Sequence, residues 1–514
     1  MKGKRTLLAL IMTLALCSLI FAAGGKEGQG KKTTDYGLDI SERVELQFWM
    51  LGNAPKDLQM IEDKVNELAL RDLNCTVKFN YTTWTDWPQK YRLLLTSGQP
   101  ADLIFTAEWT EYQRYARSGA YLELDDIIPA AAPVLLDFIG QEYWDGVKVG
   151  GDIYTIPNIW KEYVYDGFEY REDLRKKYNL PEINSVETIE KYMETVLANE
   201  AGLIGFAEGK ETERFDQIVS LTAELLHPWL DRGMPHYGMV ADNDNPREMY
   251  QYWGSDEHLA DLKLFKKWAD KGFWSRSILS SNEDPATMFQ EGKLAGKMAG
   301  INPVKYSQDI IAIGSNHPEW KVGYFPFPMT SGIVHPVHPT HNGYAVPISS
   351  KHPERAVAFF SLMLTDKEYN RLTNYGIEGV HYNVVDGYYQ MVGDQTSNGF
   401  QRESMNCWAW RNPEYMLFDP SFDPVLKIFE EFDKFQTPDL YNGFAEDYTP
   451  FQSERTALQQ IMSEYLAPLQ AGLIDDVEAG LAKFMSEAKK AGLEKVQKMY
   501  VEQWIAYCDD MGIK

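Results

Sequence analysis

A β-strand is predicted by the stretch Val44-Glu45-Leu46-Gln47-Phe48-Trp49, because every second residue in it is apolar. Helical spacing of apolar residues follows from Asp57 to Asp72. A second strand is predicted from Cys75 to Tyr81, a second helix from Trp87 to Thr96, and a short buried strand from Asp102 to Phe105. Strands that alternate with helices indicate an α/β unit with a largely parallel sheet.

Tryptophans follow or end these predicted strands. Trp49 closes the first strand, Trp84 follows the second, and Trp109 follows the third. In open α/β sheets, ligands bind at the carboxyl ends of the strands. We therefore expect these three indoles to converge on a ligand.

Many aromatic residues of this chain, which has 14 Trp and 30 Tyr, lie in short polar clusters. Examples are Trp84-Thr85-Asp86-Trp87, Trp160-Lys161-Glu162-Tyr163 and Trp408-Ala409-Trp410-Arg411. An aromatic face beside carboxylates and guanidinium groups suits a carbohydrate, since the sugar ring stacks while its hydroxyls need polar partners. The alternative for each aromatic residue is packing in a core or at an interface.

The N-terminus has the pattern of an export signal. Lys2, Lys4 and Arg5 precede a nearly unbroken apolar run from Leu7 to Phe21, and small residues follow it. This order predicts a signal peptide over residues 1–24, cleaved after Gly24. Cys17 offers a lipoprotein alternative, which the bulky Leu16 and the continuing apolar run disfavour. Residues 25–42 are Gly-, Lys- and Thr-rich and predict a flexible spacer.

Composition narrows the classes of partner. The chain has 514 residues, too many for one compact core, so two or three domains are expected. A net charge of −25 argues against nucleic acid or anionic lipid as a partner.

The cysteines Cys75, Cys407 and Cys508 lack the spacing of metal ligands. They allow at most one disulfide.

Ordered motifs along the chain resemble one protein family. They include Leu46-Gln47-Phe48-Trp49-Met50, Asp86-Trp87-Pro88-Gln89-Lys90-Tyr91, Ser97-Gly98-Gln99-Pro100-Ala101-Asp102, Ser118-Gly119-Ala120-Tyr121-Leu122-Glu123-Leu124-Asp125-Asp126, Lys148-Val149-Gly150-Gly151-Asp152-Ile153-Tyr154-Thr155-Ile156-Pro157, Met288-Phe289-Gln290-Glu291-Gly292-Lys293-Leu294-Ala295 and Tyr375-Gly376-Ile377-Glu378-Gly379-Val380-His381-Tyr382. The chain is similar to extracellular solute-binding proteins of carbohydrate ABC transporters (family 1). The last motif resembles a subgroup with an additional C-terminal domain of unknown function.

The resemblance implies an α/β, two-lobed periplasmic-binding-protein-like fold (type II) with a largely helical C-terminal extension. It places residues 43–158 and 330–384 in the N-terminal lobe, and residues 159–329 and 385–514 in the second lobe. Chain crossings are expected near residues 157–163, 325–329 and 382–387. The implied protein is periplasmic or extracellular, captures a small solute between the lobes, and delivers it to the membrane permease of an ABC transporter. We expect a monomer without a cofactor.

Candidate ligand contacts lie near the expected crossings and strand ends, where aromatic faces would stack and charged groups would bind hydroxyls. They are Trp49, Trp84, Trp109, Trp160, Tyr163, Asp166, Asn302, Asn342, Glu378, His381, Tyr382, Trp408, Trp410 and Arg411.

Other chemistries have weaker support in the sequence. The chain lacks a phosphate-binding loop, a dinucleotide fingerprint after the first strand, and a nucleophile elbow, so we expect no enzyme. A secreted carbohydrate-active enzyme stays open, because abundant carboxylates could supply a catalytic pair. A peptide or glycopeptide ligand also stays open, as does a surface adhesion or sensor role. His335, His338 and His341 stand three apart, but intervening prolines prevent a helix, and we expect no metal site.

Overall fold

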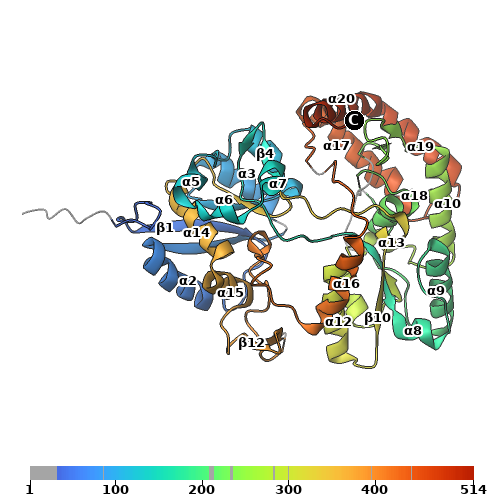
Figure 1. Cartoon of the computed structure of the whole chain (residues 1–514). Coiled ribbons are helices and arrows are strands. Elements are labelled where there is room, and N and C mark those ends of the chain that lie inside the picture. The colour runs from blue at the N-terminus through green and yellow to red at the C-terminus, as the bar shows by residue number, and fades with distance from the viewer. Residues whose placement is uncertain are drawn as a thin grey trace, which may run out of the picture.

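Two lobes, linked by extended segments, make up the described chain (Figure 1). The computed structural model describes residues 32–514 except residues 85, 208–213, 232–235, 282–283, 299, 395 and 442. The expected signal peptide and Cys17 therefore lie outside the described residues.

Four strands form the sheet of the first lobe, in the order β11-β3-β1-β2. They are β1 (Val44–Leu51), β2 (Cys75–Thr82), β3 (Leu103–Thr106) and β11 (Gly343–Ala345). β1 pairs in parallel with β2 and β3, whereas β11 pairs antiparallel with β3. Helices α2 (Leu58–Leu73) and α3 (Trp87–Ser97) connect the parallel strands. The alternating α/β pattern expected over residues 44–105 is confirmed, and each boundary lies within two residues of its expected position.

Phe48 lies at the centre of the first core because it points inward from the central strand. Its ring contacts those of Phe79, Tyr344, Phe359 and Trp410 at centroid distances between 4.6 and 6.2 Å. Helices α14 (Pro353–Thr365) and α15 (Lys367–Tyr375) contribute to this core and contact α2. The core thus gathers residues from the beginning and from the later part of the chain.

The second lobe contains a three-stranded antiparallel sheet with the strand order β10-β6-β9. Its strands are β6 (Gly167–Arg171), β9 (Gly296–Lys297) and β10 (Val322–Pro326). The main helices of this part are α8 (Glu172–Lys177), α9 (Val186–Asn199), α10 (Asp256–Asp270) and α12 (Pro303–Asn316). Phe168 and Tyr192 are buried at the centre of its core.

The C-terminal extension is largely helical, as expected, and packs against the second lobe (Figure 1). Its longer helices are α16 (Asp423–Phe432), α17 (Gln452–Ile461), α19 (Val477–Lys490) and α20 (Leu493–Met511). Apolar residues of α19, Val477, Leu481 and Phe484, join Trp253 in a shared core. The apolar stripe of this helix therefore packs in a core, as its spacing predicts.

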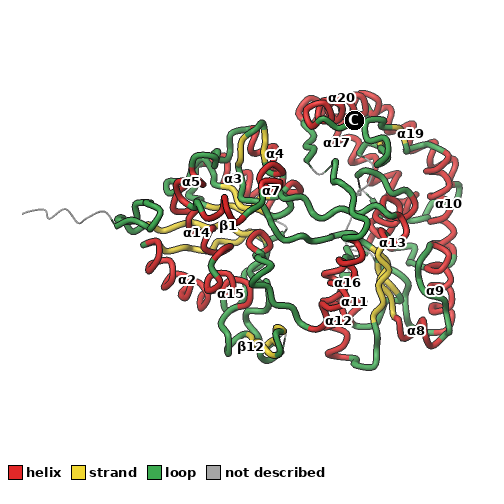
Figure 2. The backbone as a smooth tube through the Cα atoms, in the orientation of Figure 1, coloured by secondary structure: helices red, strands yellow, loops and turns green. Residues whose placement is uncertain are grey.

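Loop segments carry the chain between the lobes (Figure 2). The chain leaves the first core after Ile156, leaves the second-lobe core after Phe327 and returns to the first core at Tyr344. The last passage follows Trp410, later than the expected residues 382–387. The reason is that β12 (Tyr382–Val385) and β13 (Tyr388–Met391) form a hairpin, after which residues 400–410 return to the first core.

The described part of the expected spacer is ordered against the first lobe. Thr33 forms a bridge with Asp39, and Ile40 is buried. The Arg355 guanidinium donates a hydrogen bond of 2.7 Å to the carbonyl of Asp39. One buried isoleucine thus anchors a segment whose composition had indicated flexibility.

Cys75, Cys407 and Cys508 are free and buried. Among the described residues, no helix combines the length and apolarity needed to cross a bilayer.

Candidate ligand-binding site

A cavity of about 550 Å³ lies between the two lobes. Its walls come from both lobes and from the segments that connect them. The lining residues are Trp84, Glu108, Trp109, Glu162, Val164, Asn302, Val304, Lys305, Gln308, His341, Asn342, Arg402, Glu403, Asn406, Trp408 and Arg411. This volume lies within the usual range of ligand pockets, about 300–1,000 Å³.

Three tryptophans form the first-lobe wall of this cavity. The Trp84 ring stacks near Trp109 at a centroid distance of 6.2 Å and near Trp408 at 6.0 Å, with interplanar angles of 25° and 30°. Trp84 is 47% exposed and Trp109 is 38% exposed. Clustered exposed apolar surface of this kind marks a binding site, because large aromatic faces gain free energy when they are covered.

Local structure explains how these indoles reach one wall. Trp84 follows the carboxyl end of β2, and Trp109 lies in the 3₁₀ turn Glu108–Thr110 after β3. Trp408 begins another 3₁₀ turn, Trp408–Trp410, which contacts β11. The Trp109 indole nitrogen donates to the carbonyl of His341 at 2.9 Å, which fixes the ring.

Helix α12 supplies the opposite wall. Asn302 caps its amino end by accepting a hydrogen bond of 3.0 Å from the Lys305 backbone. Lys305 and Gln308 lie on the exposed side of the helix, and Val304 is buried beside the cavity. Polar groups of the second lobe therefore face the tryptophan wall of the first.

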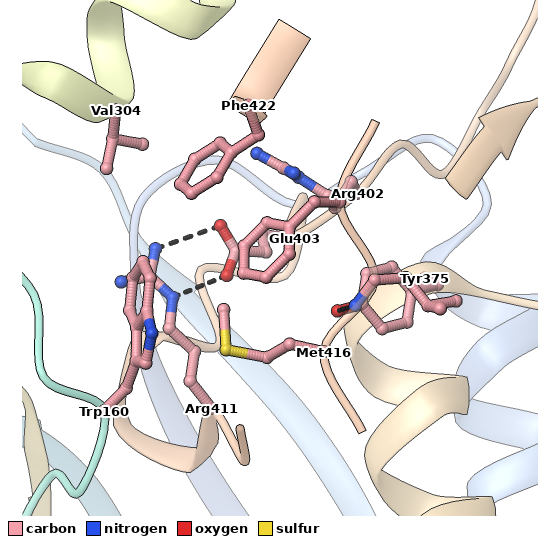
Figure 3. Close-up of a pocket in the computed structure, with 10 residues that line it drawn as sticks. Trp160, Val304, Tyr375, Arg402, Glu403, Arg411, Met416 and Phe422 are labelled. Carbon is pink, nitrogen blue, oxygen red and sulfur yellow. Dashed lines mark hydrogen bonds and ion pairs between the residues drawn. The ribbon is translucent and has the colours of Figure 1, made fainter. Parts of the chain in front are cut away.

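A buried guanidinium lies where the wall segments meet (Figure 3). Arg411 donates to Glu162 at 2.7 Å and forms two further bonds to Glu403, at 2.5 and 3.0 Å. Its guanidinium also stacks over the Trp160 ring at 4.5 Å. Because Glu162 belongs to the first passage and Glu403 to the return segment, this one side chain joins both.

The ion pair controls the ionisation of Glu403. Burial alone would raise the pKa of Glu403, but the Arg411 guanidinium outweighs burial and holds that pKa below its ordinary value. Arg411 has its own pKa raised by the same two carboxylates, despite its burial. Arg411 and Glu403 therefore stay charged, and Glu403 presents carboxylate oxygens as hydrogen-bond acceptors.

The structure brings part of the predicted residue set together. The candidates that line the cavity are Trp84, Trp109, Asn302, Asn342, Trp408 and Arg411. The Trp160 ring stacks against the Arg411 guanidinium and is only 9% exposed, so it supports the site without lining the cavity (Figure 3).

Trp49, Trp410 and Tyr163 do not line this cavity, for three geometric reasons. β1 continues to Leu51, so Trp49 lies before the strand end, and its indole donates to the Pro100 carbonyl. Trp410 points into the core from the opposite side of the turn that carries Trp408, and bonds Thr373. In the extended first passage, alternate residues face opposite ways, and Tyr163 points to Asp433 instead.

The remaining candidates also lie elsewhere. Asp166 accepts a hydrogen bond from Ser220, and Glu378 is exposed in the turn before β12. His381 is buried, with one ring nitrogen facing Asp57 at 3.3 Å. Tyr382 packs against Tyr375 and Tyr389. The motif from Tyr375 to Tyr382 therefore shapes a turn of the first lobe and lies outside the cavity.

Several lining residues were absent from the predicted set: Glu108, Glu162, Val164, Val304, Lys305, Gln308, His341, Arg402, Glu403 and Asn406. Two of them had a usable signal. Glu108 adjoins Trp109, and Glu162 lies in the quoted cluster that starts at Trp160. The others depend on the tertiary path of residues 402–411, on the direction of α12 and, for Val164 and His341, on the course of the first two passages between the lobes.

The three spaced histidines have separate partners. His335 faces Asp439 at 3.2 Å, His338 faces Thr340 at 2.7 Å, and His341 faces Glu108 at 2.7 Å. Within the described ranges, no group of three or more His, Cys, Asp or Glu side chains is placed to hold a metal ion.

Another cavity, of about 600 Å³, lies within the second lobe. Its described lining lies in the ranges 197–207 and 271–281, both of which belong to the second lobe. The interlobe cavity fits a binding role better, because both lobes and a row of exposed indoles contribute to it.

A two-lobed α/β fold with a cavity at the lobe interface defines a solute-binding protein. Residues 65–370 match the family of bacterial extracellular solute-binding proteins, so the chain belongs to this family. Residues 440–509 match a domain of unknown function, DUF3502. The expected resemblance and fold class are both confirmed.

Named relatives extend this comparison. A carbohydrate ABC transporter substrate-binding protein of Streptococcus pneumoniae serotype 4 is 21% identical, over 97% of this chain and 98% of the relative. The crystal structure of an N-glycan transport solute-binding protein (NgtS) of Streptococcus pneumoniae shares the fold with a TM-score of 0.70 and 18% identity, over 91% of this chain and 100% of that one. The Streptococcus pneumoniae protein FusA in complex with kestose has a TM-score of 0.60 and 14% identity, over 91% and 100%.

The lowered pKa of Glu403 makes stability depend on pH. Ionised Glu403 stabilises the folded chain above its unfolded pKa, near 4.5, and this contribution disappears as the pH falls through the lower folded pKa. Urea unfolding between neutral pH and about pH 3 should therefore show a flatter acid dependence for Glu403→Gln than for the wild type. The exposed Glu430→Gln variant is the control. Equal acid slopes for the wild type and Glu403→Gln would contradict the ion-pair assignment.

Proposed function

We propose that this chain captures a sugar or oligosaccharide in the interlobe cavity and delivers it to the permease of an ABC transporter. The observation that carries the proposal is the row of Trp84, Trp109 and Trp408, which faces the polar end of α12 across about 550 Å³. Indole faces suit the apolar faces of sugar rings, and the carboxylate and amide groups beside them suit hydroxyls.

Relatives support the sugar assignment. The curated relative is named as a carbohydrate ABC transporter protein, and the similar structures include complexes with Man5GlcNAc and with kestose. Capture at micromolar concentration requires about −8 kcal/mol, which a few stacked rings and several charge-assisted bonds can supply net of ordering costs. Because the two walls belong to different lobes, hinge closure would enclose the sugar.

The charges of the cavity support a binding role over catalysis. A glycosidase needs one carboxylic acid whose pKa is raised so that it can donate a proton. The pKa of Glu403 is lowered instead, and both Glu403 and Glu162 are bound to Arg411. These two carboxylates are therefore fixed acceptors, and the third carboxylate of the lining, Glu108, is paired with the His341 ring.

The same proposal covers export. The charged start, the apolar run and Gly24 support cleavage of residues 1–24 and a periplasmic or extracellular location. Intact mass of the secreted chain should correspond to residues 25–514, and Cys17→Ser should leave that mass unchanged. A lipid-modified Cys17 at the new N-terminus would overturn this part and favour membrane anchoring.

Trp84→Ala and Trp109→Ala should each weaken sugar binding by roughly tenfold, because stacked aromatic anchors contribute on the order of 1–2 kcal/mol. A titration of Man5GlcNAc, kestose and a panel of peptides by calorimetry measures this. Trp49→Ala is the matched control, because this tryptophan is half-buried in the same lobe but lies outside the cavity. The sugar affinity of this variant should stay at the wild-type level. Binding of peptides and of no sugar would reject the carbohydrate assignment, and sustained sugar cleavage would reject the binding role.

A further inference from the structure

The turn from Glu108 to Glu111 has two sides with different surroundings. Glu108 and Trp109 face the cavity. Glu111, two residues after Trp109, has φ 66° and ψ 32°, a left-handed conformation that is unfavourable for a residue with a side chain. Contacts outside the turn must therefore stabilise its shape.

One such contact comes from the C-terminal domain, residues 440–509. The Tyr448 hydroxyl donates to the Glu111 carboxylate at 2.7 Å. Arg114, in the short helix α4 (Tyr112–Arg117) that follows, donates to the same carboxylate oxygen at 2.8 Å and lies 5.0 Å from the Tyr448 ring centroid. Arg455 of the C-terminal domain lies 4.4 Å from that centroid. A tyrosine of the C-terminal domain thus joins a carboxylate of the first lobe.

Tyr448 is held firmly on its own side. The backbone carbonyl of the neighbouring Asp447 accepts a hydrogen bond of 2.9 Å from the Gln503 side-chain amide. The Asp447 backbone N–H donates one of 2.7 Å to the oxygen of the same amide, and the pair fixes the loop to α20. Phe451, three residues later, is fully buried in the core of the C-terminal domain. The tyrosine can therefore transmit the position of this domain to the Glu108–Glu111 turn.

The cavity side of the turn is fixed by a different segment. Trp109 donates to the His341 carbonyl at 2.9 Å, and Glu108 pairs with the His341 ring at 2.7 Å. The turn is therefore held between the second passage on one side and Tyr448 on the other. Loss of the Tyr448 bond would release only one of these two supports.

We propose that Tyr448 is a positioning residue for the sugar site: it acts through Glu111 to hold Trp109 in its binding orientation. This inference rests on the proposed function. It assigns a role to the C-terminal domain, which supplies none of the described residues that line the cavity. In this arrangement the domain braces the first-lobe wall from the side of the second lobe.

Tyr448→Phe tests this role because it removes the hydroxyl and keeps the ring. Calorimetric titration should show roughly fivefold weaker binding of whichever of Man5GlcNAc and kestose the wild type binds more tightly. This is less than the full effect of losing a hydrogen bond to a charged group, because Arg114 still holds the Glu111 carboxylate. Hydrogen exchange in the free chain should become faster over residues 108–116. Tyr465→Phe, the same substitution elsewhere in the C-terminal domain, should change neither readout. The urea midpoints of both variants should agree, which separates positioning from global stability.

A double-mutant cycle with Glu111→Gln identifies the partner. If Tyr448 acts through Glu111, the double variant should bind about as weakly as either single variant. Wild-type affinity in Tyr448→Phe, or additive losses in the double variant, would overturn the inference. Trp109→Ala separates the two levels: if it leaves affinity unchanged, the proposed site itself fails, whereas a loss there without a loss in Tyr448→Phe rejects only the positioning role.

Discussion

The buried charge of Arg411 is the constraint on which the binding site depends. A guanidinium that is 4% exposed needs partners, and it finds them in Glu162 and Glu403. Removing one member of such a buried cluster typically costs about 3–5 kcal/mol, since a charge is left uncompensated. Because Arg411 pairs with both carboxylates, the first passage and the return segment lie side by side, and both contribute walls to the cavity.

The rest of the site follows from this junction. The return segment that contains Glu403 also carries Trp408, which completes the indole row with Trp84 and Trp109. The Trp160 ring packs against the guanidinium, and the end of α12 faces the indoles from the second lobe. An aromatic wall on one lobe and a polar helix end on the other suit a ligand with apolar faces and polar edges. Family membership and the named relatives agree with this arrangement.

Sequence patterns predicted the elements of the first lobe well, because apolar alternation and helical spacing are local properties. They also predicted Trp84 and Trp109, since the residues after parallel strands must lie at one edge of the sheet. The patterns were less informative where the direction of a side chain determines whether the residue lines the cavity. Trp408 and Trp410 are two residues apart in a single turn, yet one lines the cavity and the other fills the core. Glu162 and Tyr163 face opposite ways in an extended segment, and only the tertiary structure shows which way is inward.

A crystal structure of the chain with a bound oligosaccharide tests the central claim most directly. The account predicts a sugar ring stacked on the row of Trp84, Trp109 and Trp408, with hydroxyls bonded to Glu162 or Glu403 and with α12 closer to the indoles than in the free chain. A sugar bound in the second-lobe cavity between residues 203–207 and 271–281, with the interlobe cavity empty, would contradict it.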